Sequence, residues 1–121
     1  MKKVLEVRHL TKRYGQHLAL DNVNLTLEKG EVYGLIGRNG AGKTTLIKVI
    51  TKLIRPSQGS VSLFHSTSKS EWTHALKRVG SVIETPVALN HLNARQNLRY
   101  YCKIHHVPNP DKVIDEVLDT V

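Results

Sequence analysis

Long apolar runs are absent from this chain of 121 residues, and no stretch reaches the roughly 18 apolar residues that a transmembrane helix needs. Charges interrupt the apolar residues of segment 1–8, which is not the pattern of a secretory signal peptide. Cysteine is scarce as well. The single cysteine, Cys102, cannot form an internal disulfide, which fits a reducing cytoplasm, and we expect it to pack in a helix rather than act as a nucleophile.

Acidic residues are outnumbered, with 10 Asp and Glu against 18 Lys and Arg, a formal net charge of +8 and a pI near 9.8. This excess favours an anionic partner: nucleotide phosphates, an anionic membrane surface or nucleic acid. The chain shows neither a long basic cluster nor the aromatic–basic interleaving of single-strand binders, so no nucleic acid is expected. Zinc-ligand spacing is also missing, and the adjacent His105 and His106 point in different directions on a helix.

The most specific pattern is a glycine-rich loop. Residues 37–45 read Gly-Arg-Asn-Gly-Ala-Gly-Lys-Thr-Thr and fit the phosphate-binding pattern G-x-x-x-x-G-K-[ST]. Glycines let the backbone turn its N–H groups toward phosphate oxygens, Lys43 reaches the β- and γ-phosphates, and the Thr44 hydroxyl can ligate Mg²⁺. We therefore predict a site for a nucleotide polyphosphate with Mg²⁺. Its phosphate-binding residues are Gly37, Arg38, Asn39, Gly40, Ala41, Gly42, Lys43, Thr44 and Thr45.

Both flanks of the loop support this prediction. The apolar run 32–36 before it is typical of a buried strand. After it, apolar residues recur at helical spacing over 46–54, which predicts a helix whose positive N-terminal end faces the phosphates. Strand, glycine loop and helix are the context that the motif requires.

The remaining pattern predicts further elements around this centre. Strands are expected at 4–10 and 18–27, joined by a polar turn at 11–16 into an antiparallel hairpin, then at 60–64 and 79–84, the last one broken by Thr85-Pro86. Helices are expected at 71–77, at 92–106 with Asn93 as its cap, and at 111–121. The fold class is α/β: a P-loop NTPase core with an N-terminal antiparallel β subdomain over 1–84, and the start of a helical subdomain over 85–121.

The order of these pieces resembles the ATP-binding domain of ABC transporters over nearly the whole chain. The run 53–61, Leu-Ile-Arg-Pro-Ser-Gln-Gly-Ser-Val, is similar to the family's L-x-x-P-x-x-G-x-V passage, and 92–98 is similar to its L-T-x-x-E-N-L passage. The resemblance implies that Tyr14, 29 positions before Lys43, stacks on adenine, and that Thr45 binds the α-phosphate.

Glu84 is a departure from the family. The family usually carries a glutamine here, which contacts Mg²⁺ and the attacking water, and a glutamate resembles the bacitracin-resistance and lantibiotic-immunity branch. A carboxylate binds Mg²⁺ more strongly than an amide does, but it cannot donate a hydrogen bond when ionised. The resemblance therefore implies that Glu84 faces Mg²⁺ and the γ-phosphate, and that Glu84 and Lys43 take part in catalysis. A solvated carboxylate at a strand end is the alternative.

The family's signature sequence, its second carboxylate-bearing strand and its switch histidine do not occur before Val121. The pattern is that of the N-terminal half of an ATPase domain, either a piece of a longer protein or a truncated gene product. Strands from the other half would lie between segments 32–36 and 79–83. We therefore expect these segments to lack partners, and the 121-residue chain to hydrolyse ATP only at background rate.

The resemblance implies an ATP-binding subunit that drives export, and the bacitracin and lantibiotic branch implies a peptide antibiotic as the class of exported compound. It also implies transmembrane permease subunits and a second ATP-binding subunit as partners, and a cytoplasmic position at the inner face of the membrane. Two alternatives stay open: a module that binds nucleotide without hydrolysing it, and an ABC-type ATPase that acts on nucleic acid. The sequence does not indicate the transported compound.

Overall fold

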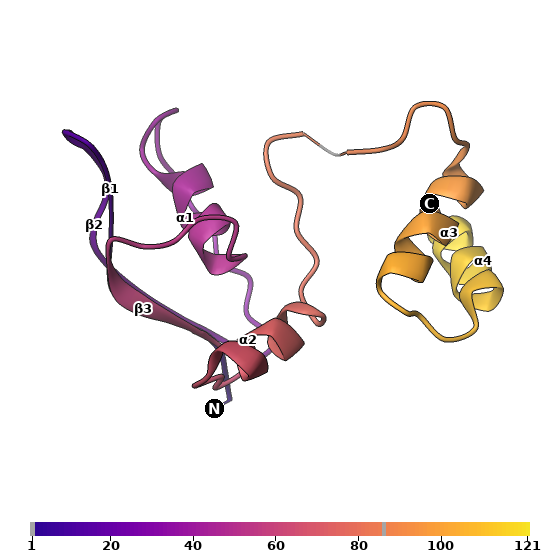
Figure 1. The fold of residues 1–121 in the computed structure, drawn as a ribbon, viewed down its shortest axis with the longest axis horizontal. Coiled ribbons are helices and arrows are strands. Elements are labelled where there is room, and N and C mark those ends of the chain that lie inside the picture. Colours follow the sequence, from indigo (N-terminus) through magenta and orange to yellow (C-terminus); the bar gives the residue numbers. More distant parts are fainter. Residues whose placement is uncertain (1, 86) are drawn as a thin grey trace. The chain divides into compact units, whose positions relative to one another are not determined.

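The computed structural model describes residues 2–85 and 87–121, which form two compact units that divide between Glu84 and Thr85 (Figure 1). Pro86, expected to break a strand, lies outside the described residues. Among these residues, no helix is long and apolar enough to cross a membrane.

A three-stranded antiparallel sheet in the order β2-β1-β3 forms the first unit's framework, with strands β1 (Lys3–Tyr14), β2 (His17–Glu28) and β3 (Gln58–Leu63). The predicted hairpin is confirmed, since β1 and β2 pair over their length. The polar turn predicted at 11–16 is wrong in extent: pairing continues to Tyr14 opposite His17, and only two residues connect the strands. Gly15, with φ of 54°, supplies the positive φ that such a short connection demands.

Helices α1 (Lys43–Ile50) and α2 (Lys69–Leu76) follow the loop and β3 respectively. Helix α1 ends earlier than the predicted 54, because Thr51 leaves the helical conformation and Lys52 has a left-handed φ of 64°. Helix α2 begins at a capping box, in which Ser68 and Glu71 each accept a hydrogen bond from the other's backbone N–H.

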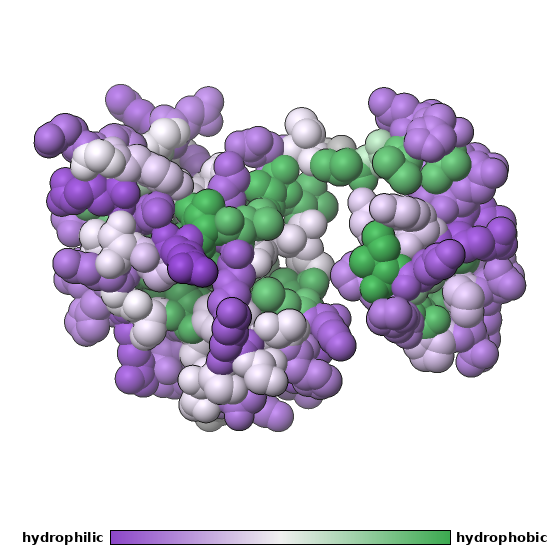
Figure 2. Space-filling model, in the orientation of Figure 1, coloured by the Kyte–Doolittle hydropathy of each residue, from purple (hydrophilic) through white to green (hydrophobic). Residues whose placement is uncertain are grey.

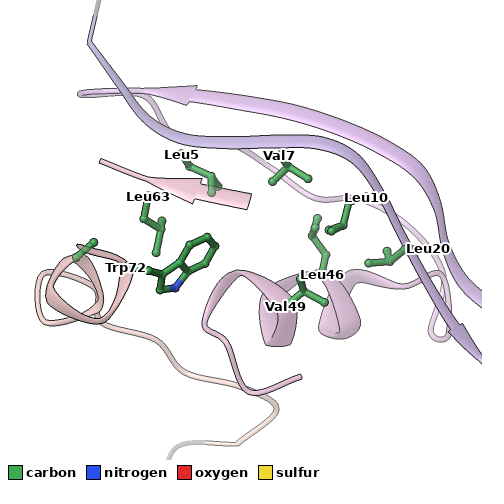
Figure 3. Close-up of a cluster of buried hydrophobic side chains, with 9 residues drawn as sticks. Leu5, Val7, Leu10, Leu20, Leu46, Val49, Leu63 and Trp72 are labelled. Atoms are coloured by element: carbon green, nitrogen blue, oxygen red, sulfur yellow. The ribbon is translucent and has the colours of Figure 1, made fainter. Parts of the chain in front are cut away.

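The hydrophobic core lies between one face of the sheet and these two helices (Figure 3). The sheet contributes buried aliphatic side chains from all three strands, and α1 and α2 close the other side. Burying a side chain of this size stabilises the fold by about 1.5–3 kcal/mol. The core residues are Leu5, Val7, Leu10, Leu20, Leu46, Val49, Leu63, Trp72 and Ala75.

Two predicted strands are not formed. Among the described residues, segments 32–36 and 79–83 belong to no strand. In the first segment the apolar side chains of Val32 and Ile36 are exposed to solvent, with exposed fractions of 100% and 99%. Figure 2 shows hydrophobic residues, in green, among the hydrophilic ones on the surface of the molecule. A strand needs a neighbour for its backbone N–H and C=O groups, and neither segment pairs with the sheet of β1, β2 and β3.

The second unit is a pair of helices, α3 (Ala94–Ile104) and α4 (Pro110–Thr120). Asn93 caps α3 as predicted, in a capping box with Gln96. Ion pairs join the two helices, Arg95 to Asp115 at 2.7 Å and Arg99 to Asp111 at 3.1 Å. The only buried side chain on α4 is Ile114, which is 1% exposed.

Candidate nucleotide site

The glycine loop leads directly into α1. The backbone N–H of Ala41 donates to the carbonyl of Arg38 over 3.1 Å, which closes a turn within the loop. Gly42 is the N-cap of α1 and makes no side-chain cap hydrogen bond, and its carbonyl accepts the first helical bond from Leu46 at 2.9 Å. The first-turn N–H groups of α1 therefore have no side-chain cap, and such groups attract an anion.

Gly42 is required at this position by both its conformation and its surroundings. Its φ is 97°, in the left-handed region that favours glycine. A Cβ built on it would lie 2.5 Å from the carbonyl oxygen of Ala19 and 3.0 Å from Cδ2 of Leu20. The absent side chain thus lets the start of α1 lie directly against β2, which brings the glycine loop beside the hairpin.

A pocket of about 330 Å³ forms where the loop meets the hairpin. This volume is at the lower end of the range typical of small-molecule sites. Its lining combines the end of the β1–β2 hairpin with the loop and the first turn of α1: Tyr14, His17, Ala19, Asn39, Gly40, Gly42, Lys43, Thr44 and Thr45. Six of the predicted phosphate-binding residues and the predicted base-stacking tyrosine therefore share one pocket.

Tyr14 is the last residue of β1 and is 46% exposed. Its ring is in contact with a cation, since Nζ of Lys12 lies 4.9 Å from the ring centroid. Sequence reasoning missed His17 and Ala19. Their place in the pocket follows from the two-residue hairpin connection, which pairs His17 with Tyr14. Recognising a tight turn at Gly15-Gln16 would have predicted this pairing.

The Lys43 ammonium lies against the loop itself. It donates hydrogen bonds to the carbonyl oxygens of Gly37 and, over 3.3 Å, Arg38. The loop thus keeps a positive charge beside its own backbone, at the start of a helix whose dipole is positive there. Thr44 and Thr45, the next two residues of α1, add hydroxyl groups to the pocket.

Glu84 lies elsewhere. Glu84 is not among the described residues that line the pocket. Its Oε1 lies 3.5 Å from Nζ of Lys48 on α1. Its φ of 64° places the backbone in the left-handed region. The structure therefore brings Tyr14 to the glycine loop and holds Glu84 against the side of α1. The contact of Glu84 with Mg²⁺ and the γ-phosphate stays a prediction.

This fold and loop are those of an ABC-type ATP-binding domain. The ABC transporter family model matches residues 20–121, and the chain belongs to that family. It is similar to an ATP-binding subunit of an ABC transporter, with a TM-score of 0.77 and 30% identity, covering 88% of this chain and 44% of that structure. The predicted fold class is confirmed.

Curated relatives place the chain in a particular branch. It is 37% identical, over all 121 residues, to the bacitracin transport ATP-binding protein BcrA of Bacillus licheniformis, of which it covers 39%. It is 40% identical over 97 residues to the lantibiotic transport ATP-binding protein SrtF of Streptococcus pyogenes, covering 79% of this chain and 41% of that protein. The resemblance to the bacitracin and lantibiotic branch is confirmed. The chain spans about two fifths of the length of these relatives.

Proposed function

We propose that this chain forms the nucleotide-binding part of an ABC-transporter ATP-binding subunit that exports a peptide antibiotic. The observation that carries the proposal is the pocket that joins Tyr14 to the glycine loop at the start of α1. A nucleotide base needs an exposed aromatic face on which to stack. A polyphosphate needs a set of N–H donors and a cation. The pocket offers both next to each other.

The residues present fit MgATP. Backbone N–H groups of the loop and of the first turn of α1 bind phosphate oxygens, and the Lys43 ammonium moves from the carbonyls of Gly37 and Arg38 to the β- and γ-phosphates. Thr45 binds the α-phosphate and Tyr14 stacks on adenine. The Thr44 hydroxyl is the ligand for Mg²⁺, an oxygen donor of the kind that this ion prefers. Bound Mg²⁺ neutralises charge on the phosphates.

Hydrolysis is attack of water on the γ-phosphorus, which depends mainly on positioning and charge stabilisation. In this proposal the chain contributes the phosphate cradle, and a second ATP-binding subunit completes the γ-phosphate site. Permease subunits carry the exported compound, so the ATP-binding subunit lies at the cytoplasmic face of the membrane. The names of the bacitracin and lantibiotic transport relatives support a peptide antibiotic as cargo.

Isothermal titration of the chain with ATP tests the proposal. Lys43→Ala removes a charge-assisted contact worth about 1.5–3 kcal/mol, so the affinity should fall at least about tenfold. Lys29→Ala is the matched control, because Lys29 is an exposed lysine in the turn after β2 and does not line the pocket. Equal affinity of the Lys43→Ala and Lys29→Ala variants would refute the assignment of the loop.

A module that binds nucleotide without hydrolysing it is the second candidate. The position of Glu84, ion-paired to Lys48 and outside the pocket, favours this candidate for the 121-residue chain. A steady-state phosphate-release assay beside the titration separates the two. Binding with background turnover supports the module, and turnover that is lost in Lys43→Ala supports an ATPase.

A further inference from the structure

Lys48 is the ion-pair partner of Glu84. The 3.5 Å ion pair between them joins α1 to residue 84, the last residue of the first unit. The Lys48 side chain is 34% exposed and that of Glu84 is 66% exposed, so the pair is open to solvent and can break. Exposed pairs of this kind hold together weakly.

The pair lies on one particular face of α1. Leu46 and Val49 turn toward the sheet (Figure 3), whereas Thr44 and Lys48, four residues apart, share a face that points away from the core. Four residues span about 6 Å along a helix axis. Thr44 and Lys48 therefore lie about one turn apart on this face of α1, and the Glu84 carboxylate is ion-paired to Lys48.

We propose that Lys48 competes with the divalent cation of the nucleotide site for the carboxylate of Glu84. This inference rests on the proposed function. A glutamine at residue 84 is neutral and forms no ion pair, so the competition exists only because this chain carries a glutamate there. Binding of MgATP transfers the carboxylate from the ammonium of Lys48 to the cation next to Thr44.

The test is the gain in ATP affinity that Mg²⁺ produces. For each variant, the dissociation constant of ATP is measured by titration calorimetry in EDTA and in excess Mg²⁺, and the ratio of the two is compared. Lys48→Ala should raise this ratio about two- to fivefold over the wild type, the scale of an exposed ion pair. Lys48→Arg retains the charge and should leave the ratio unchanged.

The double variant separates the ion pair from a general effect of charge. A general repulsion between Lys48 and the cation would raise the ratio equally with or without Glu84. If Lys48 acts through the ion pair, Lys48→Ala in a Glu84→Gln background should leave the ratio as it is in Glu84→Gln alone. An unchanged ratio in Lys48→Ala, or the same rise in both backgrounds, overturns the proposal. Loss of ATP binding by the wild type itself overturns the proposed function instead.

A second measurement is made on the wild-type chain. Carbodiimide joins an amine to a carboxylate in contact with it, with loss of one water, so the wild-type chain should yield a Lys48–Glu84 linked peptide in mass spectrometry. Lys48→Arg, which has no amine there, is the control. Saturating MgATP should suppress the link, because the carboxylate has moved to the cation. A link that forms equally with and without MgATP, or no link at all, also overturns the proposal.

Discussion

Replacing Gly42 by alanine should loosen the junction between α1 and β2 and with it the nucleotide site. The new Cβ meets two obstacles, the carbonyl oxygen of Ala19 at 2.5 Å and Cδ2 of Leu20 at 3.0 Å. The first of these is backbone, which cannot rotate away as a flexible side chain can. Either α1 or the hairpin must therefore move.

The magnitude has two parts. An alanine in the left-handed region costs about 1–2 kcal/mol relative to its preferred conformations. Forcing one extra carbon into a filled site adds about 1–3 kcal/mol. The free energy of unfolding should therefore fall by about 2–5 kcal/mol, a large fraction of the roughly 5–15 kcal/mol that stabilises an ordinary domain.

Gly30→Ala separates the two parts. Gly30 has a φ of 89°, close to the 97° of Gly42, but no atom lies within 4 Å of a Cβ built on it. Gly30→Ala therefore places an alanine in the left-handed region and changes the entropy of the unfolded chain, as Gly42→Ala does, but it creates no steric clash. Urea unfolding of both variants should therefore differ by about 1–3 kcal/mol, the clash alone.

Nucleotide titration completes the experiment. A shift of α1 away from β2 separates Lys43 from Tyr14, so Gly42→Ala should weaken ATP binding while Gly30→Ala leaves it intact. If both variants unfold with the same free energy to within about 0.5 kcal/mol, the contact of Gly42 with β2 does not exist in solution. The account of how the hairpin reaches the loop would then be wrong.

Three further predictions concern the base, the pH and the unpaired segments. Tyr14→Ala should weaken ATP by about 1–3 kcal/mol and inorganic triphosphate hardly at all, as measured by calorimetry, whereas Tyr14→Phe should retain both; equal losses would exclude stacking. Hydrogen bonds from Thr67 hold the pKa of Glu71 below its ordinary value of 4.5, so the ionised carboxylate stabilises the fold above that pH and this stabilisation is lost as the pH falls through the lower folded pKa. In Glu71→Gln, the free energy of unfolding measured in urea should therefore fall less on acidification than in the wild type. An equal fall in both proteins would contradict this prediction. The chain should self-associate in equilibrium sedimentation through its exposed apolar segments, and a Val32→Glu, Ile36→Glu variant should be more monomeric; equal association would place the contact elsewhere.

Local chemistry made several features predictable from the sequence. The loop at 37–45 and the cap at Asn93 involve hydrogen bonds between residues a few positions apart, so a short stretch of sequence contains all that they need. The hairpin was predictable because its two alternating strands are neighbours along the chain. The predicted end of β1 was wrong, because the polar residues at its end still pair with β2.

Contacts between distant segments were decided only by the tertiary structure. The apolar runs at 32–36 and 79–83 have strand composition, but a strand forms only where a neighbouring strand satisfies its backbone groups. The place of His17 in the pocket depends on hairpin pairing, and the ion pair of Lys48 with Glu84 joins residues that the sequence leaves unrelated. The sequence by itself thus determined the phosphate-binding chemistry, which is local, whereas the fold decided which side chains from other elements meet it, because such meetings depend on packing across the whole core.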